Sequence, residues 1–243
     1  HHPQRGDVEP DVYIPMLEAS GQIVEVGRWV LEEACRQMAE WRTRGHLLDV
    51  SVNVSAVQLD TSAFVDDVRE CLARTGLDPT ALILEITETA VMRDTQAATE
   101  RLTELKQLGV RVAIDDFGTG WSSLAILQQL PIDLLKIDRS FIEGLDDEGN
   151  EADPVIDALL RLGKTMGLAT LAEGIEELRQ FDRLQRADCD SGQGFLFARP
   201  LDPASVEKFL AANRVSNGGV RANGTPESHA EIALARDRDA AQA

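Results

Sequence analysis

The sequence predicts an α/β fold, a modified TIM (β/α)8 barrel in which parallel strands alternate with helices. Six short apolar segments are typical of buried strands, and helical stretches separate most of them. Polar or charged residues end these strands; they are Asn53, Glu85, Asp115, Asp116, Lys136, Glu173 and Gln193. Every strand end faces one mouth in a closed barrel, whereas only the strands near the switch point meet in an open sheet, so we expect closure. An eight-stranded barrel needs two further strands, and we expect these first strands upstream of residue 1.

The composition indicates an acidic globular protein. The chain has 243 residues, with 42 aspartates and glutamates against 24 lysines and arginines, and a formal net charge of −18. This charge repels a nucleic-acid backbone and argues against binding to duplex nucleic acid. Three widely spaced cysteines without a CxxC motif predict reduced thiols that fill the core. No apolar run is long enough to span a membrane and no signal peptide is visible, so we expect a cytoplasmic protein or the cytoplasmic part of a membrane-anchored one.

The first half of the chain predicts one long helix followed by two strand–helix pairs. Residues 21–44 carry apolar side chains on one broad side and charges elsewhere, which predicts an amphipathic helix that tolerates Gly27. Gly76 marks a helix end and Asp94 a helix start. The elements after the first helix are a strand at 47–54, a helix at 61–75, a strand at 81–87 and a helix at 94–108.

The second half continues the alternation. Its predicted elements are a strand at 110–114, a helix at 122–130, a strand at 134–137, a helix at 154–166, a strand at 169–172, a helix at 176–186, a strand at 194–197 and a helix at 203–212. Residues 146–153 are expected to form a solvated acidic loop. Apolar periodicity then stops, so we expect the barrel in residues 1–212 and a disordered tail in residues 213–243.

The sharpest local motif is the pair of carboxylates at Asp115 and Asp116. Adjacent side chains at a strand end point in different directions, so the pair can serve two cations. Two cations can clamp the attacking and the leaving oxygens of a phosphodiester. Gly118 and Gly120 permit a tight loop after the pair. The alternative is a helix N-cap accompanied by a second surface acid.

Further oxygen donors and one lysine surround this motif. Asn53, Glu85 and Glu173 are ligands that suit magnesium, manganese or calcium rather than zinc or copper. Each could instead satisfy a buried backbone group, although an ionised Glu85 after an apolar run is costly without a partner. Lys136, in a core strand, would stay charged among carboxylates and orient water or a phosphate oxygen. The alternative for Lys136 is an ion pair with Asp138.

The last strand has glycines where it approaches the mouth. Gly192 and Gly194 allow a ligand to come close to the backbone. Phe195 or Phe197 could stack a base, although core packing is the default expectation for both.

Together these motifs resemble the EAL family of cyclic-di-GMP phosphodiesterases. The resemblance runs from residue 1 to about residue 210 and rests on six motifs in the family's order. They are Ser51-Val52-Asn53-Val54-Ser55, Leu84-Glu85-Ile86-Thr87-Glu88, Asp115-Asp116-Phe117-Gly118-Thr119-Gly120, Leu135-Lys136-Ile137-Asp138, Ala172-Glu173-Gly174-Ile175-Glu176 and Gly192-Gln193-Gly194-Phe195.

The resemblance implies a metal-dependent hydrolase of bacterial second-messenger signalling that converts cyclic-di-GMP to linear pGpG with two magnesium or manganese ions. By analogy the metal ligands are Asn53, Glu85, Asp115, Asp116 and Glu173. Catalytic roles fall to Glu173, Lys136 and Asp116, with Lys136 and Glu173 positioning and activating water. Substrate contact or loop support falls to Gln193, Asp138 and Glu88. A homodimer and further sensory or cyclase domains upstream are also implied.

The sequence departs from the family at one point. The Glu-Ala-Leu signature, which supplies a metal-ligand glutamate and a phosphate-contacting arginine, does not occur in these residues. By the family's pattern it lies roughly half a dozen residues before His1, where we expect the chain to have been cut. Residues 1–243 alone are therefore expected to be inactive. The alternatives are a catalytically inactive receptor for cyclic-di-GMP or a partner protein, and another magnesium-dependent barrel enzyme.

Overall fold

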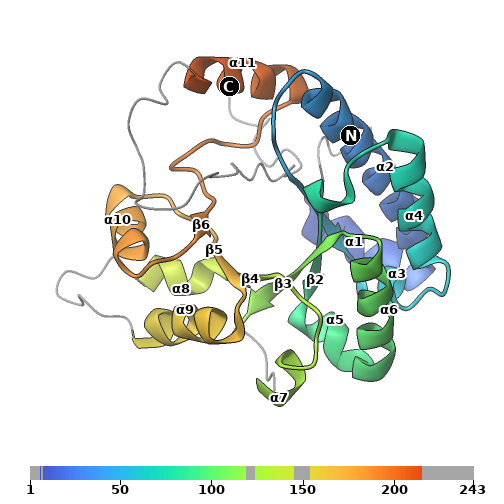
Figure 1. The fold of residues 1–243 in the computed structure, drawn as a ribbon, viewed down its shortest axis with the longest axis horizontal. Helices are drawn as coiled ribbons and strands as arrows, with labels where there is room; N and C mark the ends of the chain where they lie inside the picture. Colours follow the sequence, from blue (N-terminus) through green and yellow to red (C-terminus); the bar gives the residue numbers. More distant parts are fainter. Residues whose placement is uncertain (1–5, 7, 119–123, 145–153, 215–243) are drawn as a thin grey trace.

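A parallel sheet forms the centre of the molecule, and helices surround it (Figure 1). The computed structural model describes residues 6, 8–118, 124–144 and 154–214. Within them the sheet has six strands in unbroken chain order, and all neighbours run parallel. The strands are β1 (Val50–Val54), β2 (Leu82–Thr87), β3 (Arg111–Phe117), β4 (Leu134–Ile137), β5 (Ala169–Ala172) and β6 (Ser191–Gly192). A doubly wound sheet reverses its strand order at a switch point, so this order confirms the barrel-like prediction.

Two helices precede β1, one follows β6, and the other helices of the described residues connect successive strands. The helices are α1 (Pro10–Ser20), α2 (Ile23–Thr43), α3 (Ala56–Leu59), α4 (Phe64–Thr75), α5 (Glu88–Arg93), α6 (Thr95–Gln107), α7 (Leu124–Leu127), α8 (Arg139–Glu143), α9 (Pro154–Met166), α10 (Leu178–Arg186) and α11 (Pro203–Arg214), with a 3-10 turn at Pro79–Ala81. The capping predictions are confirmed. Gly76 ends α4 in a left-handed conformation with φ 67°, and the side chain of Asp94 accepts a hydrogen bond of 3.1 Å from the Ala97 amide at the start of α6.

The two faces of the sheet carry different layers of side chains. Because side chains alternate along a strand, Leu84 and Ile86 of β2 point to one face and Ile83 and Glu85 to the other. Leu84 and Ile86 belong to the main core, in which the sheet packs against the helices. One residue from each of four strands contributes to a separate small cluster on the opposite face; they are Ile83, Ala113, Leu134 and Leu171. Burying each large aliphatic side chain contributes about 1.5–3 kcal/mol, so these two layers fix the register of the strands.

Helix α2 fits closely against the segment after β1. A Cβ atom at Gly27 would lie 2.0 Å from the side-chain nitrogen of Gln58, so only glycine lets α2 approach α3 this closely. Gln58 is itself buried and accepts a hydrogen bond of 3.2 Å from the backbone N–H of Ser55. The glycine in the predicted helix is therefore a packing contact.

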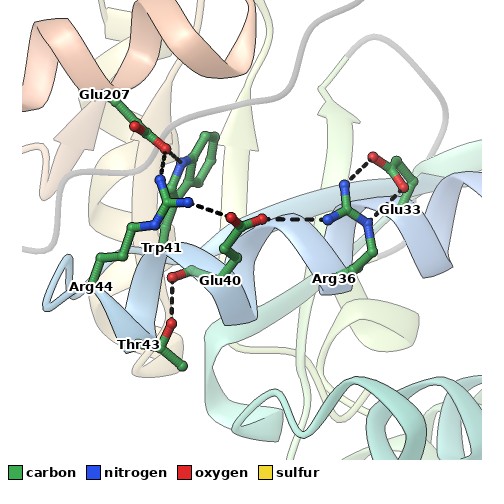
Figure 2. A network of polar contacts seen from close by, with 7 residues as sticks. All are labelled: Glu33, Arg36, Glu40, Trp41, Thr43, Arg44 and Glu207. Carbon is green, nitrogen blue, oxygen red and sulfur yellow. Dashed lines mark hydrogen bonds and ion pairs between the residues drawn. The ribbon is translucent and has the colours of Figure 1, made fainter.

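A polar network joins the end of α2 to α11 (Figure 2). The Glu207 carboxylate of α11 accepts a hydrogen bond of 3.3 Å from the Trp41 indole and pairs with Arg44. Glu40 joins Arg44 to Arg36, and Arg36 also pairs with Glu33 at 2.6 Å. Trp41 is fully buried, so Glu207 holds α11 against a core residue of α2.

The structure corrects several boundaries. The strand predicted at 194–197 is wrong, because β6 is only Ser191–Gly192 and the chain then turns, with the Phe197 amide 3.1 Å from the Gly194 carbonyl. The reason is that Gly194 rests directly on Ile175, where a Cβ atom would lie 2.1 Å from the Ile175 oxygen. The sequence prediction also lacked α1, α3, α5 and α8.

Some predictions fall outside the described residues, namely the acidic loop at 146–153, the residues at 119–123 before α7 and the tail from residue 215 onward. Asn213 and Arg214, assigned to the tail, continue α11. Cys35 and Cys71 are buried free thiols and Cys189 is a partly buried one, as predicted. No helix in the described ranges has the length and apolar character needed to cross a bilayer.

Candidate active site at the carboxyl ends of the strands

A layer of charged side chains lies next to the inner apolar cluster. Two residues toward the carboxyl end from Ile83, Ala113, Leu134 and Leu171 there is a charged residue in each case, three of them within a strand and one directly after β5. These residues are Glu85, Asp115, Lys136 and Glu173. The apolar layer fixes the register of the strands. Because side chains alternate between the two faces of a strand, the four charged residues then lie on the same face as this layer and close to one another.

Lys136 is the centre of this layer. Its Nζ atom lies 2.6 Å from Glu85 Oε2, 3.0 Å from Asp115 Oδ1 and 2.6 Å from Glu173 Oε1. Lys136 is 3% exposed and Glu85 is 4% exposed, so these charges are withdrawn from water. An ammonium group has three N–H donors, and each is matched by one carboxylate. The expected alternative, an ion pair between Lys136 and Asp138, is wrong.

The charges perturb one another strongly. Burial alone lowers the pKa of Lys136, but the carboxylates of Glu85, Asp115 and Glu173 outweigh it and raise that pKa above its usual value. Burial raises the pKa of Glu173 to about 7, opposed by Lys136 and assisted by Asp115 and Glu85. The site therefore holds one secure cation and a carboxylate close to its titration point at neutral pH.

Asp115 and Asp116 lie on an irregular stretch of β3. The register of β3 against β4 shifts between Ile114 and Phe117, as at a β-bulge. Asp116 has φ 55° and its amide donates to the Asp115 carboxylate at 3.0 Å. Asp115 faces Lys136, whereas Asp116 is exposed. The alternative of a helix N-cap is wrong, because both residues belong to the strand.

Asp116 also titrates abnormally. Although the residue as a whole is exposed, its carboxyl group is partly desolvated by its surroundings. This desolvation and the negative charges of Asp115 and Asp138 raise the pKa of Asp116 above its usual range. A cation bound near Asp116 would therefore stabilise the ionised form of its carboxyl group.

Gln193 completes the row at the far end of the sheet. Its Nε2 atom donates a hydrogen bond of 2.8 Å to Glu173 Oε1, the same oxygen that contacts Lys136. The backbone of Gln193 is tied to β5 and its continuation, with its amide on the Ala172 carbonyl at 2.9 Å and its carbonyl on the Ile175 amide at 3.0 Å. Gln193 thereby orients the Glu173 carboxylate.

The remaining predicted residues lie around this centre. Asn53 is exposed and is the direct neighbour of Glu85 in the register of β1 and β2. Asp138 caps α8 by accepting from the Ser140 amide at 3.0 Å. Glu88 is buried at the start of α5, and its Oε2 atom accepts from the Gly118 amide at 3.2 Å. Its other oxygen has no hydrogen-bond partner within the described residues.

The donor set fits divalent cations in its chemistry. Glu85, Asp115 and Glu173 offer only oxygen atoms, which magnesium and manganese prefer. Burial, together with the neighbouring carboxylates, raises the pKa values of Glu173 and Asp116, and a bound cation would stabilise the ionised form of both side chains. The carboxylates converge on Lys136, and the described residues contain no group of three or more His, Cys, Asp or Glu placed to hold an ion by themselves.

Arg199 is a residue of this region that no motif in the sequence singles out. Its guanidinium lies over the Phe195 ring, 4.8 Å from the ring centre. Phe195 and Phe197 are both exposed, so the default expectation of core packing is wrong for both. The sequence signal for this contact is the spacing of four residues between Phe195 and Arg199, because a turn after Gly194 can bring residues at this spacing to the same side.

Comparisons with known proteins agree on one family. The model of the EAL domain matches residues 1–200. MucR of Pseudomonas aeruginosa, a bifunctional diguanylate cyclase/cyclic di-GMP phosphodiesterase, is 46% identical over 212 residues, which are 87% of this chain and 30% of that protein. Cyclic di-GMP phosphodiesterase NbdA of the same organism is 41% identical over 215 residues, which are 88% of this chain and 27% of that protein. The chain thus spans less than a third of the length of either relative.

Solved structures give the same result. The PaMucR phosphodiesterase in its c-di-GMP complex superposes with a TM-score of 0.79 at 45% identity, covering 84% of this chain and 83% of that one. The EAL domain of Mycobacterium smegmatis DcpA superposes with a TM-score of 0.72 at 41% identity, covering 77% of this chain and 85% of that one.

Proposed function

This chain belongs to the EAL domain family, and we propose that its charged layer hydrolyses cyclic di-GMP to linear pGpG. The observation that carries the proposal is the convergence of Glu85, Asp115 and Glu173 on Lys136 at the carboxyl ends of parallel strands. In barrels of this kind ligands bind at that end. Two relatives above 40% identity are named as cyclic di-GMP phosphodiesterases, one of them alongside a cyclase activity.

The reaction requires a water oxygen to form a bond to phosphorus while the bond from phosphorus to the ribose 3′ oxygen breaks. The attacking water must lose a proton, and the leaving oxygen must gain one. Glu173, with a pKa of about 7, is suited to accept the proton from water. Lys136 keeps its positive charge throughout and is suited to attract a phosphate oxygen and to orient the water.

EAL phosphodiesterases are metal-dependent in general. We propose two magnesium or manganese ions for this chain, held by Asn53, Glu85, Asp115, Asp116 and Glu173 together with donors outside the described residues. Bound cations supply Lewis-acid polarisation of the phosphate and lower the pKa of bound water. The residues' own contribution is to gather carboxylates on the bulge of β3 and directly after β5. Burial and neighbouring carboxylates raise the pKa values of Asp116 and Glu173, and a bound cation would stabilise both in their ionised form.

The neighbouring residues support this centre. We propose that Gln193 holds Glu173 in its reactive orientation and that Glu88 fixes the backbone after Asp116 through the Gly118 amide. Asp138 would contact substrate beside its cap of α8. A homodimer is a further proposal that rests on the family resemblance alone. A cytoplasmic location is another, and it rests on the widely spaced cysteines, which predict reduced thiols.

The test is hydrolysis of cyclic di-GMP by the full product of the gene that encodes this chain. We expect pGpG to form with Mg²⁺ or Mn²⁺, and we expect Ca²⁺ to inhibit because it adopts looser geometry with more ligands. Excess chelator should abolish turnover. Binding without any hydrolysis in Mn²⁺ would identify an inactive receptor, and undiminished turnover in chelator would remove the metal assignment.

A further inference from the structure

An aromatic–cation pair lies exposed on the segment that follows β6. Phe195 is 40% exposed, although a large apolar ring is normally buried. The Arg199 guanidinium lies over one face of the ring, 4.8 Å from its centre, at a distance typical of a cation–π contact. The pair therefore presents flat, delocalised surfaces to solvent.

The chain fixes this pair close to the candidate active site. Phe195 is two residues from Gln193, whose side chain donates to Glu173, and two extended residues span at most about 7 Å. The next residue, Leu196, donates its amide to the Ile175 carbonyl at 2.9 Å and packs in the apolar cluster with Ile175. Gly194 rests on the Ile175 backbone. The segment is thus anchored on both sides of Phe195, which limits the positions of the ring.

Phe197 provides a contrast on the same segment. It is 43% exposed, nearly as much as Phe195. Its ring meets Phe181 of α10 edge-on, with centres 5.7 Å apart and planes at 80°. Phe197 therefore has a packing partner in the helical layer, whereas Phe195 has a stacked cation, which is the arrangement that suits a planar ligand.

We propose that Phe195 and Arg199 form a stacking platform for one guanine base of the substrate, a proposal that rests on the proposed function. A guanine is joined to the scissile phosphodiester through one ribose, so a base platform belongs next to Glu173 and Gln193. Aromatic rings and guanidinium planes both stack on bases. The N–H groups of Arg199 can also donate to O6 and N7 of guanine, a pattern that adenine does not offer because its N6 is a donor.

The test compares Phe195→Ala, Arg199→Ala and Phe197→Ala in the full gene product. Calorimetry measures the affinity for cyclic di-GMP in chelator, and kinetics with Mn²⁺ measure KM and kcat. We expect Phe195→Ala to weaken binding and raise KM by about 10- to 100-fold while kcat stays within about twofold. Phe195→Trp should restore binding because any large ring can stack. Phe197→Ala, the matched control, should leave KM unchanged.

A substrate without a purine separates stacking from a structural role. An abasic analogue of cyclic di-GMP, which is the ribose–phosphate ring without its two guanines, has the phosphodiesters but no base to stack, so its hydrolysis should be equal in the wild type and in Phe195→Ala. The platform is wrong, and the proposed function stands, if the wild type binds and cleaves cyclic di-GMP and Phe195→Ala does so equally well. An equal loss on both substrates also overturns the platform. A wild type that neither binds nor cleaves cyclic di-GMP overturns the proposed function and the platform with it.

Discussion

This protein has two networks of charged side chains, one buried at the candidate active site and one exposed between two helices. Around Lys136, three carboxylates meet one ammonium group at the carboxyl ends of the strands, and Lys136 is almost inaccessible to water. A second network runs along α2 to α11, where the ion-paired side chains are 38–54% exposed (Figure 2); they are Glu33, Arg36, Glu40, Arg44 and Glu207.

The difference lies in what each network costs. Exposed ion pairs keep most of their hydration and contribute about 0–1 kcal/mol each. Buried charges lose their hydration. Where carboxylates outnumber ammonium groups, ion pairing offsets only part of that loss in free energy. At Glu173, burial and the nearby carboxylates together outweigh the pairing with Lys136, so its pKa is raised. The cost of the buried cluster is consistent with a role of its charges in catalysis, whereas the exposed network holds α11 against α2.

Removing the central cation should have the largest effect. Lys136→Met leaves Glu85, Asp115 and Glu173 facing one another without a counter-charge, so we expect a loss of about 3–5 kcal/mol in stability in chelator. Added Mn²⁺ should recover part of that stability, because a cation compensates the carboxylates. Turnover should fall at least about 100-fold even with Mn²⁺. Thermal melts and pGpG formation measure both; full activity in Lys136→Met would mean that Lys136 is only structural.

Asp115→Asn should separate catalysis from folding. The substitution keeps the shape of the side chain and removes one charge 3.0 Å from Lys136. We expect hydrolysis to be lost while the melting temperature shifts by a few degrees or less, since two carboxylates still pair with Lys136. Retained activity would favour a structural role for Asp115. The exposed Asp182→Asn on α10 is the control, and it should change neither quantity.

Stability without metal should depend on pH through Glu173. Its folded pKa of about 7 lies above the ordinary value of 4.5, so the folded state holds the proton more tightly than the unfolded chain. This contribution is complete below pH 4.5 and is lost as pH rises toward 7, on the order of 3 kcal/mol if Glu173 alone responds. Chemical denaturation in chelator between pH 5 and 8 measures it. In Glu173→Gln the stability should decline less over this range; the same slope in both proteins would assign the effect to another group.

The exposed network should give the smallest effect. Glu207→Gln weakens the pairing with Arg44 but leaves an acceptor for the Trp41 indole, so we expect a loss of about 0.5–1 kcal/mol. The loss should shrink in 1 M salt, and turnover should stay unchanged. Denaturation followed by tryptophan fluorescence measures the change. A loss of activity would show that α11 influences the site.

The elements that the sequence could predict are those with a strong local signal. β4, β5 and α9 have the predicted boundaries because short apolar runs and a helical period define them. Helices α3, α5 and α8 are four to six residues long, too short for periodicity to show, and the segment at 194–197 is apolar without being a strand. Backbone contact between Gly194 and Ile175, distant in sequence, decides that turn.

The candidate site divides in the same way. Strand-end positions predicted which residues would gather, and the structure brings Glu85, Asp115, Lys136 and Glu173 together. The sequence could not show that Lys136 would contact all three carboxylates, because that depends on register between strands far apart in the chain. Nor could it show Arg199 stacked on Phe195, because the turn that brings them together was predicted as a strand.

The most direct test of the central claim compares Glu173→Gln with Glu207→Gln in one experiment, measuring pGpG formation with Mn²⁺ and unfolding at pH 8 in chelator. We predict that Glu173→Gln lowers turnover at least about 1,000-fold while its stability equals or exceeds that of the wild type, since a neutral side chain suits that buried position better. Glu207→Gln should show full turnover and lower stability. The account is contradicted if Glu173→Gln keeps a tenth or more of the activity, or if it unfolds more easily than Glu207→Gln.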